Sequence, residues 1–396
     1  MGRERPLWWW ALWLLLGLAI GLQALRMRIA QAAVDDMDGA RAVSIRPQNG
    51  WGQAFLAEEQ FSAGAVDAAI ASSRRALDLT PLTVVAVRTL ARSLDAKAPA
   101  GGEHAWQVAS TMGWRDPQTQ LWALLRALSN GQTDIFVIRA DALLRTQGSD
   151  PRMMSVVRQA MLEPRIRAAF LGRITADPQW RSGVFSAGHP LSGRELDGAV
   201  AALRGLGATK APPTRSELHD TLTGLIEAGR YDEAVALDRQ FIRRKPDAGS
   251  LIDDGGFDRV VRDRGDYTPF DWTPIKSASL EQSGGQRSML LTRTTHRQPL
   301  VRRLVPLAPG HYRLTYMVKG DAQSPASIGI RVSCIGTRGS LGLSSPAPLP
   351  NPDWQRRSFD FTVPAGCPLL ALDLTNLPGS QESEAQFDNI VIAPVR

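Results

Sequence analysis

The sequence predicts a multidomain protein with an N-terminal transmembrane helix, an all-α region of helical hairpins and a C-terminal all-β sandwich. Three observations predict this organisation. An uncharged, almost wholly apolar run extends from Leu7 to Leu25. From Trp51 to about Pro246 the apolar residues recur at helical spacing, and after Asp253 they alternate with a period of two. Because a chain of 396 residues is too long for one ordinary core, the two periodic regions are expected to form separate domains.

The apolar run has the length of a membrane anchor. Arg3 and Arg5 precede it, and Arg26 and Arg28 follow it. A helix of about 20 apolar residues spans a bilayer core, whereas the apolar part of a cleaved signal usually has about 7 to 15. We therefore expect an uncleaved anchor, with its four tryptophans near one membrane interface: Trp8, Trp9, Trp10 and Trp13. The alternative is cleavage near the AQAA sequence at 30–33, which has the small residues of a signal-peptidase site.

The expected location is a bacterial inner membrane, crossed once, with the soluble part in the periplasm. The two arginines on each side of the anchor do not settle its orientation. The segments expected are a cytoplasmic N-terminus at 1–6, the anchor at 7–25, a linker at 26–48, a helical scaffold at 49–246 and a β domain at 251–396.

The charge of the chain excludes no anionic partner but selects none. Lys and Arg number 46 against 39 Asp and Glu, a formal net charge of +7. The arginines are dispersed and form no dense run with interleaved aromatics, so no nucleic-acid partner is expected.

The helical region shows a rhythm of 34 residues. The pairs beginning at Leu56, Leu90 and Leu124 are spaced by 34 residues. One face of a short helix is predicted to consist of Val66, Ala69, Ile70, Ser73, Ala76 and Leu77. We expect Pro81, Pro117 and Pro151 to close successive units, since proline cannot continue a helix.

The last and first units resemble tetratricopeptide repeats. In the last unit, 214–246, the matching positions are Leu222, Leu225, Gly229, Tyr231, Ala234 and Pro246. In the first, 50–81, they are Leu56, Ala57, Gly64, Ala69, Ala76 and Pro81. Gln60, Asp238 and Phe241 depart from the pattern, and 152–213 contains no clean repeat, so an irregular stack of helical hairpins is the alternative. The resemblance implies an extended surface that docks protein partners.

The C-terminal region alternates as strands do. In HYRLTYMVKGD, the residues Tyr312, Leu314, Tyr316 and Val318 fall on one face, and SFDFTVP repeats the pattern. SIGIRVSC, PLLALDLTN and AQFDNIVIAPV are further candidate strands. Eight or so strands without intervening helices favour a two-sheet sandwich.

Several motifs together resemble a galactose-binding-like jelly roll of the carbohydrate-binding-module type. They are LIDDGGFD, PFDW, LAPGHYRLTYMV, the segment from Trp354 to Pro364, and FDNIVI. The resemblance implies that LIDDGGFD opens the first strand and that Asp258 and Asp388 hold a structural calcium ion between the first and last strands. The alternative is that these acids have no metal.

The same resemblance implies a role for aromatic residues. Tyr267, Trp272 and Trp354 are candidates for stacking on sugar rings, and the alternative is that they pack in the core or at strand edges. Cys334 and Cys367 are the only cysteines, and a single pair in an exported domain favours a disulfide over two buried thiols.

No catalytic motif is present, so no catalytic residue and no cofactor other than the calcium ion are expected. The five histidines are scattered, and the chain has neither a G-x-S-x-G nor a phosphate-binding G-x-x-x-x-G-K-[ST] sequence. The function expected is a non-enzymatic adaptor in cell-envelope or exopolysaccharide assembly, with protein partners on the helices and a polysaccharide on the sandwich. The alternatives are an interaction scaffold of an envelope or secretion complex that binds no carbohydrate, and a polysaccharide hydrolase.

Overall fold

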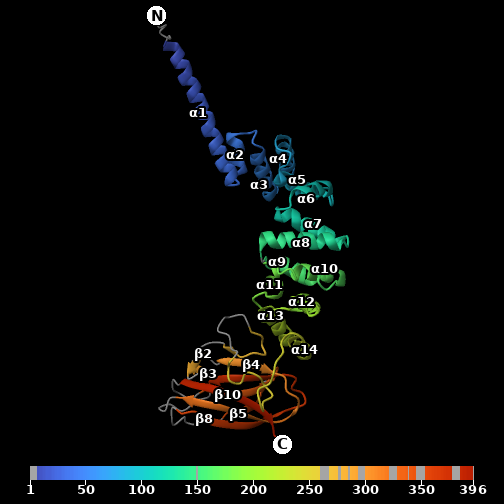
Figure 1. Cartoon of the computed structure of the whole chain (residues 1–396). Helices are drawn as coiled ribbons and strands as arrows, with labels where there is room; N and C mark the ends of the chain where they lie inside the picture. Colours follow the sequence, from blue (N-terminus) through green and yellow to red (C-terminus); the bar gives the residue numbers. More distant parts are fainter. Residues whose placement is uncertain are drawn as a thin grey trace. The chain divides into compact units, whose positions relative to one another are not determined.

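The computed structural model describes residues 7–148, 150–258, 267–274, 278–283, 286–292, 299–320, 328–337, 339–344, 353–376 and 384–395. These residues form fourteen helices and ten strands (Figure 1). The chain divides into two compact units, Met1–Asp150 and Pro151–Arg396. Helices α1 to α8 lie in the first unit, and helices α9 to α14 share the second unit with both sheets.

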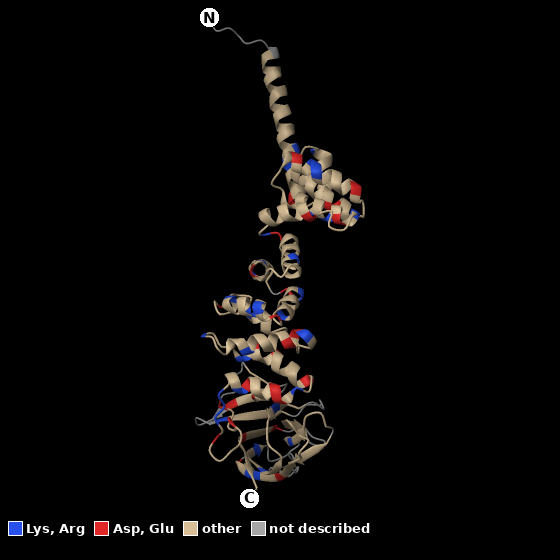
Figure 2. Ribbon diagram, turned by 90° about the vertical axis from the view of Figure 1, so that its right-hand side faces the viewer, with Lys and Arg blue, Asp and Glu red and all other residues tan. Residues whose placement is uncertain are grey.

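Helix α1 (Leu7–Asp35) contains the apolar run and continues beyond it. It is the one helix in the described part of the chain that is long and apolar enough to cross a membrane. Most of its length carries no charge, as the tan ribbon in Figure 2 shows. The segment expected to be a linker, 26–48, is instead largely helical, because α1 runs on to Asp35 and α2 (Gly39–Ile45) follows. The expected cytoplasmic residues 1–6 and the side chain of Trp8 lie outside the described part.

The end of α1 belongs to the soluble core of the first unit. Ala30 and Ala33 are each 1% exposed, and Ala33 packs in a cluster with Val34 and Ala42 of α2, against Phe55 of α3. The remaining helices of this unit are α3 (Gly50–Ser62), α4 (Val66–Leu79), α5 (Val84–Lys97), α6 (Glu103–Met112), α7 (Pro117–Ser129) and α8 (Thr133–Gln147). Each packs against its neighbour along the chain.

The second unit begins with six more helices. They are α9 (Pro151–Ala160), α10 (Pro164–Ile174), α11 (Arg181–Phe185), α12 (Gly193–Leu206), α13 (Arg215–Glu227) and α14 (Tyr231–Phe241). The Thr214 side chain and Glu217 form a capping box that starts α13. Gly229, at φ +73°, makes the tight turn from α13 to α14, as Gly64 at φ +78° does from α3 to α4.

The 34-residue rhythm is visible as the spacing of helix starts. Helices α3, α5, α7 and α9 begin at Gly50, Val84, Pro117 and Pro151, which are separated by 34, 33 and 34 residues. Pro81 does follow the end of α4. The expectation that Pro117 and Pro151 close units is wrong, since both are the first residues of helices. Proline suits that position because its missing N–H would have no partner there and its φ already fits a helix.

The predicted helical face of α4 is confirmed. Ala69, Ile70, Ser73 and Ala76 are buried, whereas Val66 and Leu77 are half-buried. The chain is therefore a series of short helical hairpins, as expected, and its membership of the tetratricopeptide repeats stays a prediction.

Ten described strands form two antiparallel five-stranded sheets, and the predicted jelly-roll sandwich is confirmed. Sheet A has the order β1-β4-β9-β6-β7 and sheet B the order β2-β3-β10-β5-β8. The strands of sheet A are β1 (Thr273–Pro274), β4 (Val301–Val305), β9 (Leu370–Asn376), β6 (Ile328–Cys334) and β7 (Ser340–Leu343). Those of sheet B are β2 (Ala278–Ser283), β3 (Gln286–Thr292), β10 (Glu384–Pro394), β5 (Gly310–Gly320) and β8 (Gln355–Val363).

The core of the sandwich lies between the inner faces of the two sheets. The alternation predicted for β5 is confirmed, since Tyr312, Leu314, Tyr316 and Val318 are buried in this core. They face the inward residues of β9, which are Leu370, Leu372 and Leu374. Every second residue of a strand points away from this core, so Arg302, Arg331 and Asp373 lie on the outer face of sheet A.

The segment LIDDGGFD, predicted to be the first strand, contains no strand. It runs beside β10 and makes isolated hydrogen bonds to it: the Leu251 amide donates to the Ile392 carbonyl at 2.8 Å, and the Ile390 amide donates to the Gly255 carbonyl at 2.9 Å. A regular ladder fails here because Asp254 and Phe257 have positive φ, 55° and 59°.

Candidate functional site

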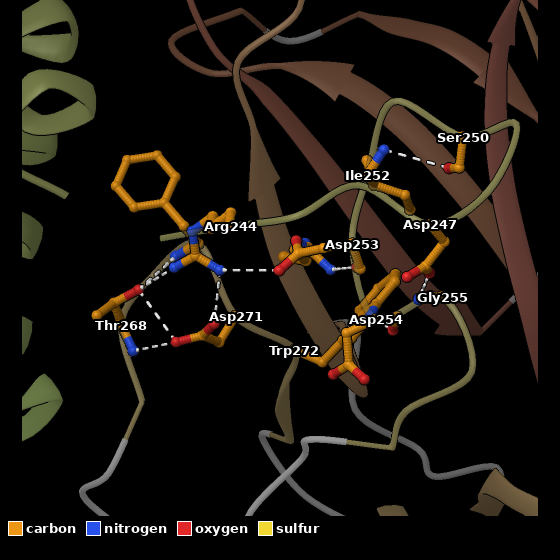
Figure 3. Close-up of polar contacts among 12 residues, drawn as sticks. Arg244, Asp247, Ser250, Ile252, Asp253, Asp254, Gly255, Thr268, Asp271 and Trp272 are labelled. Atoms are coloured by element: carbon orange, nitrogen blue, oxygen red, sulfur yellow. Dashed lines mark hydrogen bonds and ion pairs between the residues drawn. The ribbon is translucent and has the colours of Figure 1, made fainter. Parts of the chain in front are cut away.

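A network of ion pairs joins the last helix to the sandwich within the second unit. The Arg244 side chain donates to Asp238 at 2.8 Å and to Asp271 at 2.7 Å (Figure 3). Arg215 of α13 donates to the other oxygen of Asp271 at 2.6 Å. Thr268 completes the network, since its amide donates to Asp271 at 2.9 Å. The turn that precedes β1 is thereby fixed to α13, α14 and the segment after α14.

The charges in this network reinforce one another. Burial opposes the ionised form of Asp271, but the nearby Arg244 and Arg215 outweigh it and hold the pKa of Asp271 at about 2. Burial likewise opposes the charge of Arg244, while Asp238 and Asp271 raise the pKa of Arg244 above its ordinary value. All three side chains are therefore ionised at neutral pH.

A second, deeper pair lies beside the first. Arg303 points inward from β4, is 3% exposed, and donates to both the carboxylate and the backbone carbonyl of Asp253. Its guanidinium lies 5.5 Å from the centre of the Trp272 ring. Burial lowers the pKa of Arg303, and the charge of Asp253 opposes that shift. The Arg303 Nε atom is buried and has no hydrogen-bond partner.

Trp272 is a core residue, which corrects its assignment as a sugar-stacking platform. Its side chain is 2% exposed, packs against Phe257 with ring centres 5.1 Å apart, and donates from Nε1 to the Asp254 carbonyl at 2.8 Å. No face of the ring is open to a ligand. The aromatic side chain is buried because its one polar atom finds a backbone acceptor.

Tyr267 and Trp354 lie apart from Trp272 and from each other. Tyr267 is half-buried, and its ring meets the ring of His219 in α13 edge to face, at 4.8 Å. It thus contacts the helical part of the unit. Trp354 is also half-buried, and the Lys319 ammonium lies 5.0 Å from its ring centre. The structure therefore does not bring the three predicted aromatic residues together.

Asp258 and Asp388 converge on Gly256. A Cβ placed on Gly256 would lie 3.4 Å from an oxygen of Asp258 and 3.5 Å from an oxygen of Asp388. Burial raises the pKa of Asp388, a hydrogen bond from the Asn389 amide lowers it, and the like charge of Asp258 raises it again. Two carboxylates that repel across one point fit a calcium site. Among the described residues no group of three acidic, histidine or cysteine side chains completes it, so backbone carbonyls or water would supply the other ligands.

Cys334 and Cys367 form the predicted disulfide. The bond links the end of β6 to the segment before β9, with the two Cα atoms 5.6 Å apart.

The outer face of sheet A carries a row of side chains that the sequence analysis did not single out. Arg302, Asp373, Arg331 and Leu343 are register partners in turn across β4, β9, β6 and β7. Neighbouring strands are about 4.8 Å apart, so the row is ~14 Å long. We call these four residues the sheet A row.

The Asp373 carboxylate joins the two arginines of the sheet A row. Arg302 donates to it from two nitrogens at 2.7 and 3.1 Å, and Arg331 donates at 3.2 Å. Asp373 is 1% exposed, whereas the side chains of Arg302 and Arg331 are 42% and 36% exposed. The hydrogen bond to Asp373 raises the pKa of Arg302, although burial opposes it. The row therefore presents oriented N–H donors and one positive charge in excess, beside the exposed apolar side chain of Leu343.

One signal of this row was present in the sequence. Arg331 and Asp373 are charged residues at alternate positions inside otherwise apolar strands. Such residues face outward, but only the register of β4, β9 and β6 shows that they meet.

Comparisons with known proteins place the sandwich beside carbohydrate-binding modules in fold only. A CBM4 module is 17% identical over 36% of this chain and 99% of its own length, with a TM-score of 0.28. TmCBM61, solved with beta-1,4-galactotriose, is 12% identical over 37% of this chain and 99% of its own, at 0.27. The CBM22-1 xylan-binding domain of Paenibacillus barcinonensis Xyn10C is 18% identical over 32% and 86%, at 0.24. No protein-family model and no curated protein matches the sequence.

Proposed function

We propose that this protein is a non-enzymatic, membrane-anchored adaptor of the bacterial cell envelope that binds a glycan on the sheet A row of its sandwich. The observation that carries the proposal is the row itself. Its two guanidiniums are held in fixed orientation by Asp373 and still expose N–H groups to solvent. Planar guanidinium groups suit paired hydrogen bonds to hydroxyl or carboxylate oxygens. Leu343 adds an apolar contact at the end of the row.

The surplus of positive charge in the row favours an acidic glycan, such as the exopolysaccharides that carry uronic acids. The outer face of sheet B has no equivalent arrangement among its described residues, since its Arg313 and Asp360 form one exposed pair of balanced charge.

The buried end of α1 supports an anchor that is retained. The AQAA sequence at 30–33 lies inside α1, and Ala30 and Ala33 are packed against the following helices. Cleavage there would require that this packing be lost. In the proposal the anchor crosses the inner membrane once, the soluble part lies in the periplasm, and the tetratricopeptide-like helices dock protein partners.

The test is binding of the full chain in detergent to an array of acidic and neutral polysaccharides. Arg331→Gln removes one donor of the row but leaves Asp373 paired with Arg302, so the fold should persist. We expect at least a tenfold loss of affinity for the bound glycan. Arg313→Gln is the matched control, because it removes an arginine from an Arg–Asp pair on the opposite sheet. Equal affinity in the wild type and Arg331→Gln would refute the assignment of the row.

A second candidate function follows from the network around Arg244. The sandwich is fixed to α13 and α14 through Asp271 and through the contact of Tyr267 with His219. Helical repeats need a terminal cap that covers their last apolar face. The sandwich would then serve as such a cap in a protein-interaction scaffold, and the protein would bind no polysaccharide on the array.

A further inference from the structure

A pocket lies between helix α14 and strand β4, inside the second compact unit. Its volume is about 400 Å³, within the range of small-molecule sites. The lining residues come from α14 and the segment that follows it, from the turn before β1, and from β4 and its C-terminal extension. None of the residues of the sheet A row lines it.

The lining is positively charged on balance. Four arginines line the pocket, namely Arg239, Arg243, Arg244 and Arg303, against two aspartates, Asp238 and Asp253. The two aspartates bond to Arg244 and Arg303. Arg239 and Arg243 are exposed and have no hydrogen-bond or ion-pair partner among the described residues. Two positive charges are therefore left uncompensated at the pocket.

A buried donor without a partner also belongs to this lining. Arg303 is 3% exposed, and its Nε atom makes no hydrogen bond. A buried N–H without an acceptor costs about 1 to 3 kcal/mol, so such groups in native proteins call for an explanation. A ligand atom or a water molecule in the pocket would supply the acceptor.

The macrodipole of α14 gives a different reason for part of this charge. Arg239 lies in the last turn of the helix, and Arg243 follows its end. Cations near a helix C-terminus are stabilised without any ligand. That explanation does not extend to Arg303, which lies on a strand.

The rest of the lining is apolar. It consists of Val235, Ile242, Pro246, Leu251, Ile252, Phe270, Leu304, Val305 and Pro306. A ligand that fills the pocket therefore needs both an anionic group for the arginines and an apolar body for these walls.

We propose that this pocket binds a small organic anion whose carboxylate or phosphate group meets Arg239 and Arg243 and whose apolar body lies between α14 and β4. The shared chemistry fits both an acidic sugar and a short acyl chain. Glucuronate and hexanoate represent the two sources, because both are six-carbon monocarboxylates and they differ in their hydroxyl groups. Inorganic phosphate represents an anion without a body.

The experiment is calorimetric titration of the full chain in detergent, at low ionic strength, with each of the three anions. We expect saturable binding of glucuronate or of hexanoate, and the one that binds identifies the kind of body the pocket accepts. Arg239→Ala/Arg243→Ala should weaken that binding at least tenfold. Both side chains are exposed, so the melting temperature should be nearly unchanged.

Two further variants distinguish the pocket from a general effect of charge. Arg74→Ala/Arg75→Ala removes two exposed, unpartnered arginines of α4 and changes the net charge equally, so binding should be unchanged. Val235→Trp narrows the pocket without a change of charge and should weaken the organic anion at least tenfold.

Three outcomes would overturn the proposal. They are the absence of saturable binding for both organic anions, an equal loss of binding in the α4 control variant, and phosphate binding as tightly as the organic anions. The outcome is independent of the sheet A row, because Arg331→Gln alters no residue of the pocket.

Discussion

Arg244 and Asp271 form an ion pair of 2.7 Å between the segment after the last helix and the turn before the first strand. The two residues are 27 positions apart in the chain. Arg215 shares the same carboxylate at 2.6 Å, so one aspartate holds two arginines from the helical part of the unit. Asp271 is therefore the residue whose loss should most weaken the attachment of the sandwich.

Stability should fall in acid as Asp271 is protonated. The folded-state pKa of Asp271 is about 2, below the ordinary value of 3.8. A carboxyl with a lowered pKa contributes stability above its unfolded pKa, and this contribution is lost as pH falls from about 4 to about 2. Asp271→Asn should remove roughly 2 kcal/mol at pH 7 and flatten the pH dependence in that window.

Urea unfolding at pH 7 and at pH 3 would measure both effects. Asp360→Asn, which breaks the exposed pair with Arg313, is the control and should change stability little, since exposed pairs contribute little. An identical pH profile for Asp271→Asn and the wild type would contradict the role of Asp271.

Trp272→Ala should destabilise the sandwich by about 3 to 5 kcal/mol, as expected for loss of a large buried aromatic side chain. Trp354→Ala is the contrast, because Trp354 is half-exposed. It should leave the urea midpoint nearly unchanged. Comparable midpoints for the two variants would show that Trp272 is not a core residue in solution.

Calcium should stabilise the protein if Asp258 and Asp388 hold the ion. An ion that binds the native state alone adds about 2.7 kcal/mol at a hundredfold excess over its Kd. The melting temperature of the full chain should rise when EDTA is replaced by millimolar calcium. Asp388→Asn should abolish most of the rise, and Asp360→Asn should retain it. A wild-type melting temperature that is the same with calcium and with EDTA would exclude the site.

The disulfide should stabilise the sandwich through its loop. The cysteines are 33 positions apart, and closing a loop of that size stabilises by about 3 to 4 kcal/mol in the chain-entropy model. Cys334→Ser/Cys367→Ser should lower the stability by that order. Mass spectrometry after alkylation should find no free thiol in the exported wild type, and two alkylated cysteines would be the opposite result.

The mature protein should retain its first residues and require detergent. The physical reason is that α1 is long enough to remain in a bilayer and that its end is packed into the first unit. N-terminal sequencing of the native protein is the measurement. A mature chain beginning near Ala33 would identify α1 as a cleaved signal.

Local patterns predicted the elements well where one face of an element is apolar. The strands β5, β6, β8, β9 and β10 were recognised from a period of two, and the helical face of α4 from Ala69, Ile70 and Ser73. The strands β2, β3, β4 and β7 were missed, because β4 carries Arg302 and Arg303 side by side and β2, β3 and β7 show no clear alternation.

The failures have a common cause in contacts that are distant along the chain. Pro117 and Pro151 were read as stops because proline also follows helices, and only the succession of helices shows that they start new ones. Trp272 was read as a ligand platform because a tryptophan near a strand suits that role. Its burial depends on Phe257 and the Asp254 carbonyl, which meet it through the fold.

The sequence by itself determined the three-part organisation, the periodicity of each part and the cysteine pair, because each depends on residue types at short spacing or on composition. Only the tertiary structure decided which charges meet. Arg302, Asp373 and Arg331 form a row because strand register aligns them, and Arg244 reaches Asp271 because α14 packs on the sandwich. A charged residue at a polar position has no local signal of its partner, since the partner is selected by burial and register across the whole domain.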